Sequence, residues 1–221
     1  MAGEYDEALP AHVVEHYRRK RVAFILSHAA RGRVLEVGCG TGQLAEDVSC
    51  EGYEVFGIDH SRGMLRQLGR RSRAIPPVLG DGTALPFGDG VFDLTYCVAV
   101  MHHVADEGAV RRTLGEMARV TCKGGQVLVW DHNPRNPYWP YLMKRVPQDT
   151  GDERLVPEDE IVAGLVAGGA EPVLRAQLGL VPDFVPRPLV AAMAAAERAV
   201  EALPGLRRLC AHNVVLAEKR Q

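Results

Sequence analysis

The chain has 221 residues, a formal net charge of −2 and an apolar fraction of 47%. This length can bury the core of one substantial domain, and the near-neutral charge gives no electrostatic case for nucleic-acid binding. Five cysteines without Cys-x-x-Cys spacing argue against a disulfide scaffold and against a zinc site. No signal peptide or apolar segment of membrane-spanning length is visible, so we expect a cytoplasmic protein.

Over the first 130 residues, apolar patterns predict strands that alternate with amphipathic helices. The predicted helices lie at 10–30, 42–51, 61–71 and 107–120, and the predicted strands at 33–37, 54–58, 76–79, 92–98 and 126–130. Alternation of this kind implies a mainly parallel sheet with right-handed crossovers. We therefore predict a doubly wound α/β core.

The remainder of the chain is richer in proline and aromatic residues. Helices are predicted at 157–168 and 189–203, and strands at 171–180 and 212–217. Two insertions, about 132–157 and 180–207, are expected near the carboxyl edge of the sheet, where ligands bind in such folds. We predict a single domain over residues 1–221, with an antiparallel C-terminal strand.

Residues 34–42 read Val-Leu-Glu-Val-Gly-Cys-Gly-Thr-Gly, which predicts a strand, a glycine turn and the start of a helix. Open α/β sheets build nucleotide crevices in this way, because glycines let the backbone turn tightly and approach a ligand. Glu36, just before the turn, is a poor neighbour for a pyrophosphate and a good one for a cation. This favours S-adenosylmethionine (SAM), with its ammonium and sulfonium groups, over NAD, whose fingerprint needs a third glycine that is out of register here.

Further motifs follow in order along the chain. They are residues 57–61 with Met64, 80–87, 92–94, 101–104 and 123–125. With 35–42, they make the chain resemble class I SAM-dependent methyltransferases, and more narrowly the small-molecule type related to the ubiquinone-biosynthesis enzymes. The resemblance implies a Rossmann-like seven-stranded sheet that binds SAM and releases S-adenosyl-L-homocysteine (SAH).

The resemblance also implies positions that bind the cofactor. Glu36 and the glycine turn would surround the methionine moiety, and Asp59 would accept both ribose hydroxyls. Asp81 would accept a hydrogen bond from the adenine amino group, with Gly82 or Thr83 donating to a ring nitrogen. The full set is Glu36, Gly38, Gly40, Gly42, Asp59, His60, Met64, Asp81, Gly82, Thr83, Cys97, His102, Tyr17 and Arg21.

The N-terminal helix closes over SAM in relatives of this kind. Tyr5, Tyr17 and Arg21 belong to this segment here, and we expect Tyr17 or Arg21 to contact the SAM carboxylate. The basic run over residues 18–21 is better explained as a solvated helix face, with contact to an anionic ligand group as the alternative.

Methyl transfer from SAM needs few protein groups, because the positive sulfur already activates the methyl and alignment supplies much of the acceleration. A general base is needed only where the acceptor loses a proton, and the candidates are His103, Asp131 and His132. Each has a structural alternative, such as anchoring its loop. We expect no metal, because the fourth strand ends in Met-His-His and the nearest acid is Asp106.

Four aromatic residues of the two insertions are expected to line an acceptor pocket or a lid over it. They are Tyr138, Trp139, Tyr141 and Phe184; the alternative is that they form core under a long insertion. Their number predicts a partly apolar acceptor.

The predicted activity is methyl transfer to oxygen, nitrogen or carbon of a small organic molecule in a bacterial biosynthetic pathway. Two alternatives stay open. One is a SAM-binding protein of this fold that catalyses a rearrangement or cyclisation or acts as a scaffold, and the other is a membrane-surface enzyme with a lipid-linked acceptor. The predicted partner is the small-molecule acceptor, with no nucleic acid and no membrane span, as either a monomer or a homodimer.

Overall fold

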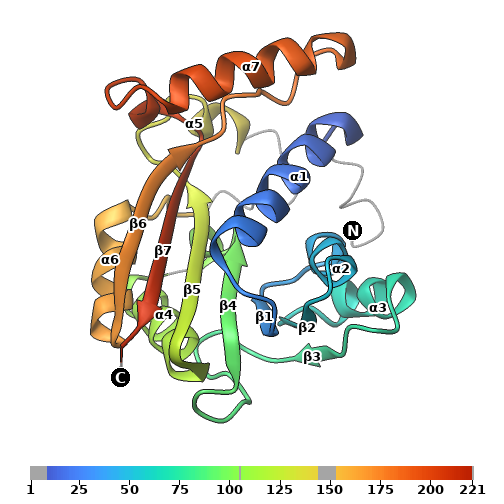
Figure 1. Ribbon diagram of the computed structural model, residues 1–221, viewed down its shortest axis with the longest axis vertical. Coiled ribbons are helices and arrows are strands. Elements are labelled where there is room, and N and C mark those ends of the chain that lie inside the picture. The colour runs from blue at the N-terminus through green and yellow to red at the C-terminus, as the bar shows by residue number, and fades with distance from the viewer. Residues whose placement is uncertain (1–8, 105, 144–152, 221) are drawn as a thin grey trace.

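A computed structural model describes residues 9–104, 106–143 and 153–220. Its strands form one sheet in the order β3-β2-β1-β4-β5-β7-β6 (Figure 1). They are β1 (Arg33–Val37), β2 (Glu54–Asp59), β3 (Pro77–Leu79), β4 (Phe92–Val98), β5 (Thr121–His132), β6 (Ala170–Leu178) and β7 (His212–Lys219). β7 pairs antiparallel with both β5 and β6, and the other pairs are parallel. The predicted mostly parallel seven-stranded sheet is confirmed.

The helices also begin and end close to the predicted residues. They are α1 (Ala11–His28), α2 (Gln43–Cys50), α3 (Arg62–Arg71), α4 (Glu107–Val120), α5 (Trp139–Leu142), α6 (Glu158–Ala167) and α7 (Val190–Glu201). Ser61 caps α3 as predicted, because its hydroxyl accepts a hydrogen bond from the Met64 backbone N–H at 3.4 Å. The short α5 was not predicted.

Two apolar cores lie on opposite faces of the sheet, because successive strand residues point to opposite sides. In β5, Val127 and Val129 belong to the core that α4 and α6 cover. Leu128 and Trp130 belong to the other core, which α1, α2 and α3 cover. Strands β1, β4 and β7 are mostly buried on both faces, whereas β3 and β6 are partly exposed.

Helix α7 lies at the top of the molecule in Figure 1, past the ends of the strands, and α1 extends toward it. Tyr5 and residues 144–152 of the first predicted insertion lie outside the described residues. Among the described helices, none is both long and apolar enough to cross a bilayer.

Candidate functional site

A cavity of about 600 Å³ opens at the carboxyl edge of the sheet. Its walls come from α1, the glycine turn after β1, the residues that follow β4 and β5, and the segments 180–183 and 209–212. Ten predicted site residues line it: Tyr17, Arg21, Glu36, Gly38, Gly40, His102, His103, His132, Tyr138 and Trp139. The structure thus brings parts of the predicted donor and acceptor sites into one cavity.

The three glycines of the turn have different reasons to be glycine, although all have positive φ (72°, 53° and 79°). A Cβ at Gly38 would lie 2.4 Å from Val100 Cγ2, and one at Gly42 would lie 2.2 Å from Leu68 Cδ1. A Cβ at Gly40 would meet no atom within 4 Å, and Gly40 borders the cavity. Gly38 and Gly42 therefore shape the turn, while Gly40 leaves room for a ligand against the backbone.

Asp59 ties the end of β2 to the glycine turn. Its buried carboxylate accepts hydrogen bonds from the backbone N–H of Gly40 at 2.9 Å and of Ser61 at 2.7 Å, one on each oxygen. A carboxylate can accept about four hydrogen bonds, so each oxygen keeps capacity for a further donor such as a ribose hydroxyl. Asp59 itself does not line the cavity.

Glu36 is the most unusual group in the cavity wall. Its side chain is almost fully buried, and within the described structure its Oε2 atom has no hydrogen-bond partner. Burial raises the pKa of this carboxyl to about 8, although the Tyr96 hydroxyl and the charge of Arg21 oppose the rise. A buried acceptor without a donor is costly, so the arrangement fits a cationic donor that enters the cavity.

His102 and Asp131 form a buried pair beneath the cavity. His102 Nδ1 and Asp131 Oδ1 are 2.7 Å apart, and the same oxygen accepts from the His132 backbone N–H at 2.6 Å. Burial alone would raise the pKa of Asp131, but the charge and hydrogen bond of His102 keep it below its ordinary value. The side-chain atoms of His102, Asp131 and His132 that could bind a metal lie within 4.8 Å of one another. The hydrogen bond between His102 and Asp131 accounts for the closeness of these two, and His132 Nδ1 lies 3.7 Å from the same Asp131 oxygen.

Aromatic rings stack along the cavity wall beside this pair. The His132 ring lies between those of His102 and Trp139, with centroids 3.9 and 3.5 Å away. Burial is the main cause that lowers the pKa of His103 to about 4 and that of His132 well below its ordinary value, and a proton on His102 would lower both further. Burial lowers the pKa of the neighbouring His212 to about 3. His103, His132 and His212 are therefore uncharged at neutral pH.

Several predicted cofactor residues do not line this cavity. His60 and Asp81 are exposed, and the Asp81 carboxylate accepts from the Thr83 backbone N–H at 2.8 Å in a local turn. Gly42, Met64, Gly82 and Thr83 also lie outside the cavity lining. Cys97 is fully buried in the core under α4, because its neighbour Val98 is the β4 residue that faces the cavity.

Two of the predicted acceptor residues lie outside the cavity. Tyr141 and Phe184 are 50% and 71% exposed, and their rings lie 6.0 and 6.1 Å from that of Tyr138. Of the four predicted aromatic residues, Tyr138 and Trp139 line the cavity, and a lid role for Tyr141 and Phe184 stays a prediction.

Other residues that line the cavity are not individually indicated by any sequence pattern described above. They include Val13, Arg18, Ala99, Asn136, Leu180, Val181, Asp183, Leu209 and His212. Ala99 has a φ of 55°, which no sequence pattern indicates. His212 lies beside His132, because the two residues pair across the antiparallel strands β5 and β7.

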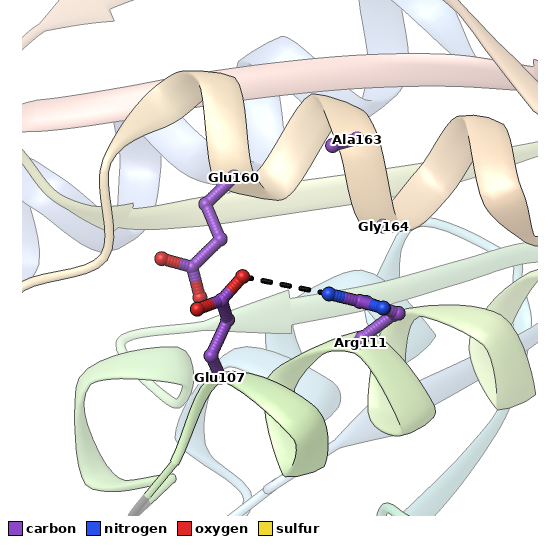
Figure 2. Close-up of a pocket in the computed structure, with 5 residues that line it drawn as sticks. All are labelled: Glu107, Arg111, Glu160, Ala163 and Gly164. Carbon is purple, nitrogen blue, oxygen red and sulfur yellow. Dashed lines mark hydrogen bonds and ion pairs between the residues drawn. The ribbon is translucent and has the colours of Figure 1, made fainter.

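A second hollow of about 190 Å³ lies between α4 and α6 (Figure 2). Figure 2 shows Glu107 directed toward Arg111, and the atoms of this ion pair are 3.4 Å apart. Both side chains are largely exposed. A solvated pair of this kind contributes little to stability and indicates no binding chemistry.

Comparison with protein families found a match to the central part of the chain. Residues 35–129 match the family model described as a methyltransferase domain. The matched region includes Glu36, the glycine turn, Asp59 and His102, and it ends before Asp131 and His132.

Known relatives extend this result. A demethylmenaquinone methyltransferase from Renibacterium salmoninarum is 36% identical over 121 residues, covering 52% of this chain and 50% of the relative. The chain thus spans about half the length of the curated relatives it matches. The predicted resemblance to class I SAM-dependent methyltransferases related to quinone biosynthesis is confirmed.

Solved structures confirm the fold around the methyltransferase domain. A SAM-dependent methyltransferase from Thermotoga maritima, described as a possible histamine N-methyltransferase, has a TM-score of 0.72 at 19% identity, covering 99% of this chain and 94% of its own. A geranyl diphosphate C-methyltransferase from Streptomyces coelicolor, solved with Mg²⁺, geranyl diphosphate and SAH, has a TM-score of 0.65 at 15% identity, covering 91% and 77%. The domain match and these neighbours support SAM as the cofactor.

Proposed function

We propose that this protein transfers a methyl group from SAM to a small, partly apolar organic molecule, in a cytoplasmic bacterial biosynthetic pathway. The observation that carries the proposal is the buried Glu36 oxygen without a donor, in the cavity wall beside the glycine turn. SAM supplies a methyl group that its sulfonium already activates, and its ammonium is a donor that Glu36 would accept. Gly40 leaves open space at the same place.

Arg21 and Tyr17 take different roles in this proposal. The Tyr17 hydroxyl donates to the Val181 carbonyl at 2.8 Å, so its proton already holds α1 against the segment 180–183. The Arg21 guanidinium lines the cavity, 5.8 Å from the centre of the Tyr17 ring. We therefore assign binding of the SAM carboxylate to Arg21. Tyr17 instead holds the cavity wall in position.

His102 is the general base in this proposal, where the acceptor atom carries a proton. The Nδ1–H group donates to Asp131, which leaves Nε2 as the basic nitrogen of the ring. As the acceptor atom bonds to the methyl carbon and the carbon–sulfur bond breaks, the acceptor proton moves to Nε2. Asp131 then stabilises the imidazolium, because the pair keeps this carboxylate ionised. His103 and His132 are weaker bases, since the pKa of each is lowered.

The far wall of the cavity indicates the acceptor class. Apolar side chains such as Leu142, Leu180 and Val181 line it, with Asn136 and Asp183 as the polar groups among them. This lining fits a molecule with an apolar part and a few polar atoms. The relatives named as demethylmenaquinone methyltransferases favour a quinone-type or hydroxylated aromatic ring, methylated on carbon, oxygen or nitrogen.

Calorimetric titration with SAM and SAH tests the cofactor. Glu36→Gln removes the negative charge at constant shape, and we expect SAM binding to weaken at least about tenfold, as for a lost buried charged hydrogen bond. Glu107→Gln, on the exposed ion pair of Figure 2, is the matched control and should bind SAM as wild type does. Equal SAM binding by all three proteins would overturn the proposal.

Product analysis tests the reaction. We expect hydroxylated aromatic and quinone-type acceptors to gain one methyl group by mass spectrometry, with one SAH released for each. Conversion of an acceptor without SAH release would instead support the rearrangement alternative.

A further inference from the structure

Helix α7 has its charged side turned inward. Glu197 is buried, accepts from the backbone N–H groups of Leu180 and Val181 at 2.6 and 3.2 Å, and pairs with His16 and Lys20 of α1. The exposed positions of the helix are instead mostly alanines: Ala191, Ala192, Ala195, Ala196 and Ala199. A helix beside water usually presents its charged side outward, so the outer face of α7 has the opposite polarity.

Large exposed apolar side chains also occur in the segments that directly precede and follow α7. Leu189, Leu203, Leu206 and Leu209 are each 51–53% exposed, and Phe184 is 71% exposed. The last three leucines are joined by successive turns, because the Leu206 N–H donates to the Leu203 carbonyl and the Leu209 N–H to that of Leu206. We call the exposed alanines of α7 with these five residues the docking face. Single exposed apolar residues are ordinary, but this many in one helix and the segments next to it favour a binding surface.

The charges around the docking face are basic. Arg187, Arg198 and Arg208 are exposed and Arg207 is half-buried, and none of the four forms an ion pair with another described residue. The nearby acids are engaged elsewhere: Glu197 and Glu201 pair with Lys20, and Asp183 accepts from the Tyr138 hydroxyl. An apolar face with free arginines in a chain of net charge −2 is complementary to an anionic lipid surface.

The docking face also adjoins the cavity. Leu209 lines the cavity and is half exposed, so one side chain belongs to both surfaces. The Phe184 ring lies 6.1 Å from that of Tyr138, which lines the cavity as well.

We propose that the docking face binds the surface of an anionic membrane and lets an acceptor with an apolar tail pass from the lipid into the cavity. The entry of the acceptor rests on the proposed function, but the binding to lipid does not.

Vesicle flotation tests the inference on the full chain. We expect wild type to float with vesicles that contain phosphatidylglycerol, less with phosphatidylcholine alone, and less again in about 0.5 M NaCl. The double variant Leu203→Ser/Leu206→Ser should lose flotation, and Arg187→Gln and Arg198→Gln should each weaken the partition coefficient about fivefold.

Matched controls lie on other faces of the molecule. Leu79→Ser, at a leucine that is 47% exposed on the edge strand β3, should float as wild type does. Arg111→Gln, in the hollow of Figure 2, should do the same.

Three results would overturn the inference. The first is that wild type does not float with any vesicles, and the second is that the control variants lose flotation as much as the docking-face variants. The third is that light scattering shows a wild-type dimer that Leu203→Ser/Leu206→Ser converts to monomers, because a second copy of the chain would then occupy the docking face. SAM titration of the same proteins separates the two proposals: lost flotation with intact SAM binding concerns only the docking face. Absent SAM binding in wild type would count against the proposed function alone.

Discussion

The Nδ1 atom of His102 lies 2.7 Å from a carboxylate oxygen of Asp131, and both side chains are buried. His102 follows β4 and Asp131 is the second-last residue of β5, so two neighbouring parallel strands position the pair. The sheet therefore fixes which ring nitrogen carries the proton, and with it the direction in which the imidazole is basic.

Asp131→Asn should lower the rate of methyl transfer about 10²–10⁴-fold for an acceptor that loses a proton, because the amide neither fixes the tautomer nor stabilises the imidazolium. Single-turnover assays measure the rate, and SAM titration checks that the site is intact. His103→Gln is the control and should retain most of the activity. A large loss with His103→Gln and none with Asp131→Asn would move the base to His103.

SAM binding should release a proton. The pKa of Glu36 is raised to about 8 mainly by burial, so this carboxyl is largely protonated at neutral pH and must ionise to pair with an ammonium. Affinity should therefore rise from about pH 6 to about pH 8, with about one proton released near pH 7. Calorimetry in two buffers of different ionisation enthalpy measures the release. Proton release that persists in Glu36→Gln would assign it to another group.

Gly40→Ala should abolish most SAM binding at a modest cost in stability. The added methyl enters the open space at the cavity, and the positive φ costs about 1–2 kcal/mol. Gly124→Ala is a matched control, because Gly124 also has positive φ and open space but lies away from the cavity. Urea unfolding should show similar losses for the two variants, and titration should show lost SAM affinity only for Gly40→Ala. Equal SAM affinities would place the ligand elsewhere.

Glu197→Gln should destabilise the protein by about 3 kcal/mol at pH 7. Burial alone would raise the pKa of Glu197, but hydrogen bonds from His16 and Lys20 lower it to about 2. A depressed pKa gives stability that is complete above the unfolded value and is lost as the pH falls toward the folded one. The difference from wild type in urea unfolding should therefore shrink between about pH 4.5 and about pH 2. A loss that is independent of pH would show that the charge of Glu197 is not the cause.

The donor side of the site could be predicted because its signals are local. Strand, glycine turn and helix follow within residues 33–50, and Asp59 ends the next strand along the chain. Cys97 is an exception, because it is buried in the core under α4 while its neighbour Val98 lines the cavity, and successive strand residues point to opposite faces.

The acceptor side depends on contacts that no local pattern contains. Tyr17 meets Val181 across 164 sequence positions, and His16 meets Glu197 across 181. The inward position of Glu197 is decided by α1, so an alanine-rich helix alone does not indicate which of its sides is buried. The outward turn of Phe184 and Tyr141 has the same cause, because tertiary packing decides which aromatics fill the cavity.

The contact between α1 and α7 has a consequence for how the protein is made. Residues 35–129 form the central α/β unit, but the cavity wall needs both α1, which is synthesised before this unit, and the segment 180–212, which is synthesised after it. A nascent chain can therefore assemble its glycine turn well before it has the outer walls of the cavity. Helix α1 and the segment 180–212 could be exchanged together to give this scaffold a different acceptor. The exchange should keep Glu197 and its basic partners His16 and Lys20, because they join the two pieces.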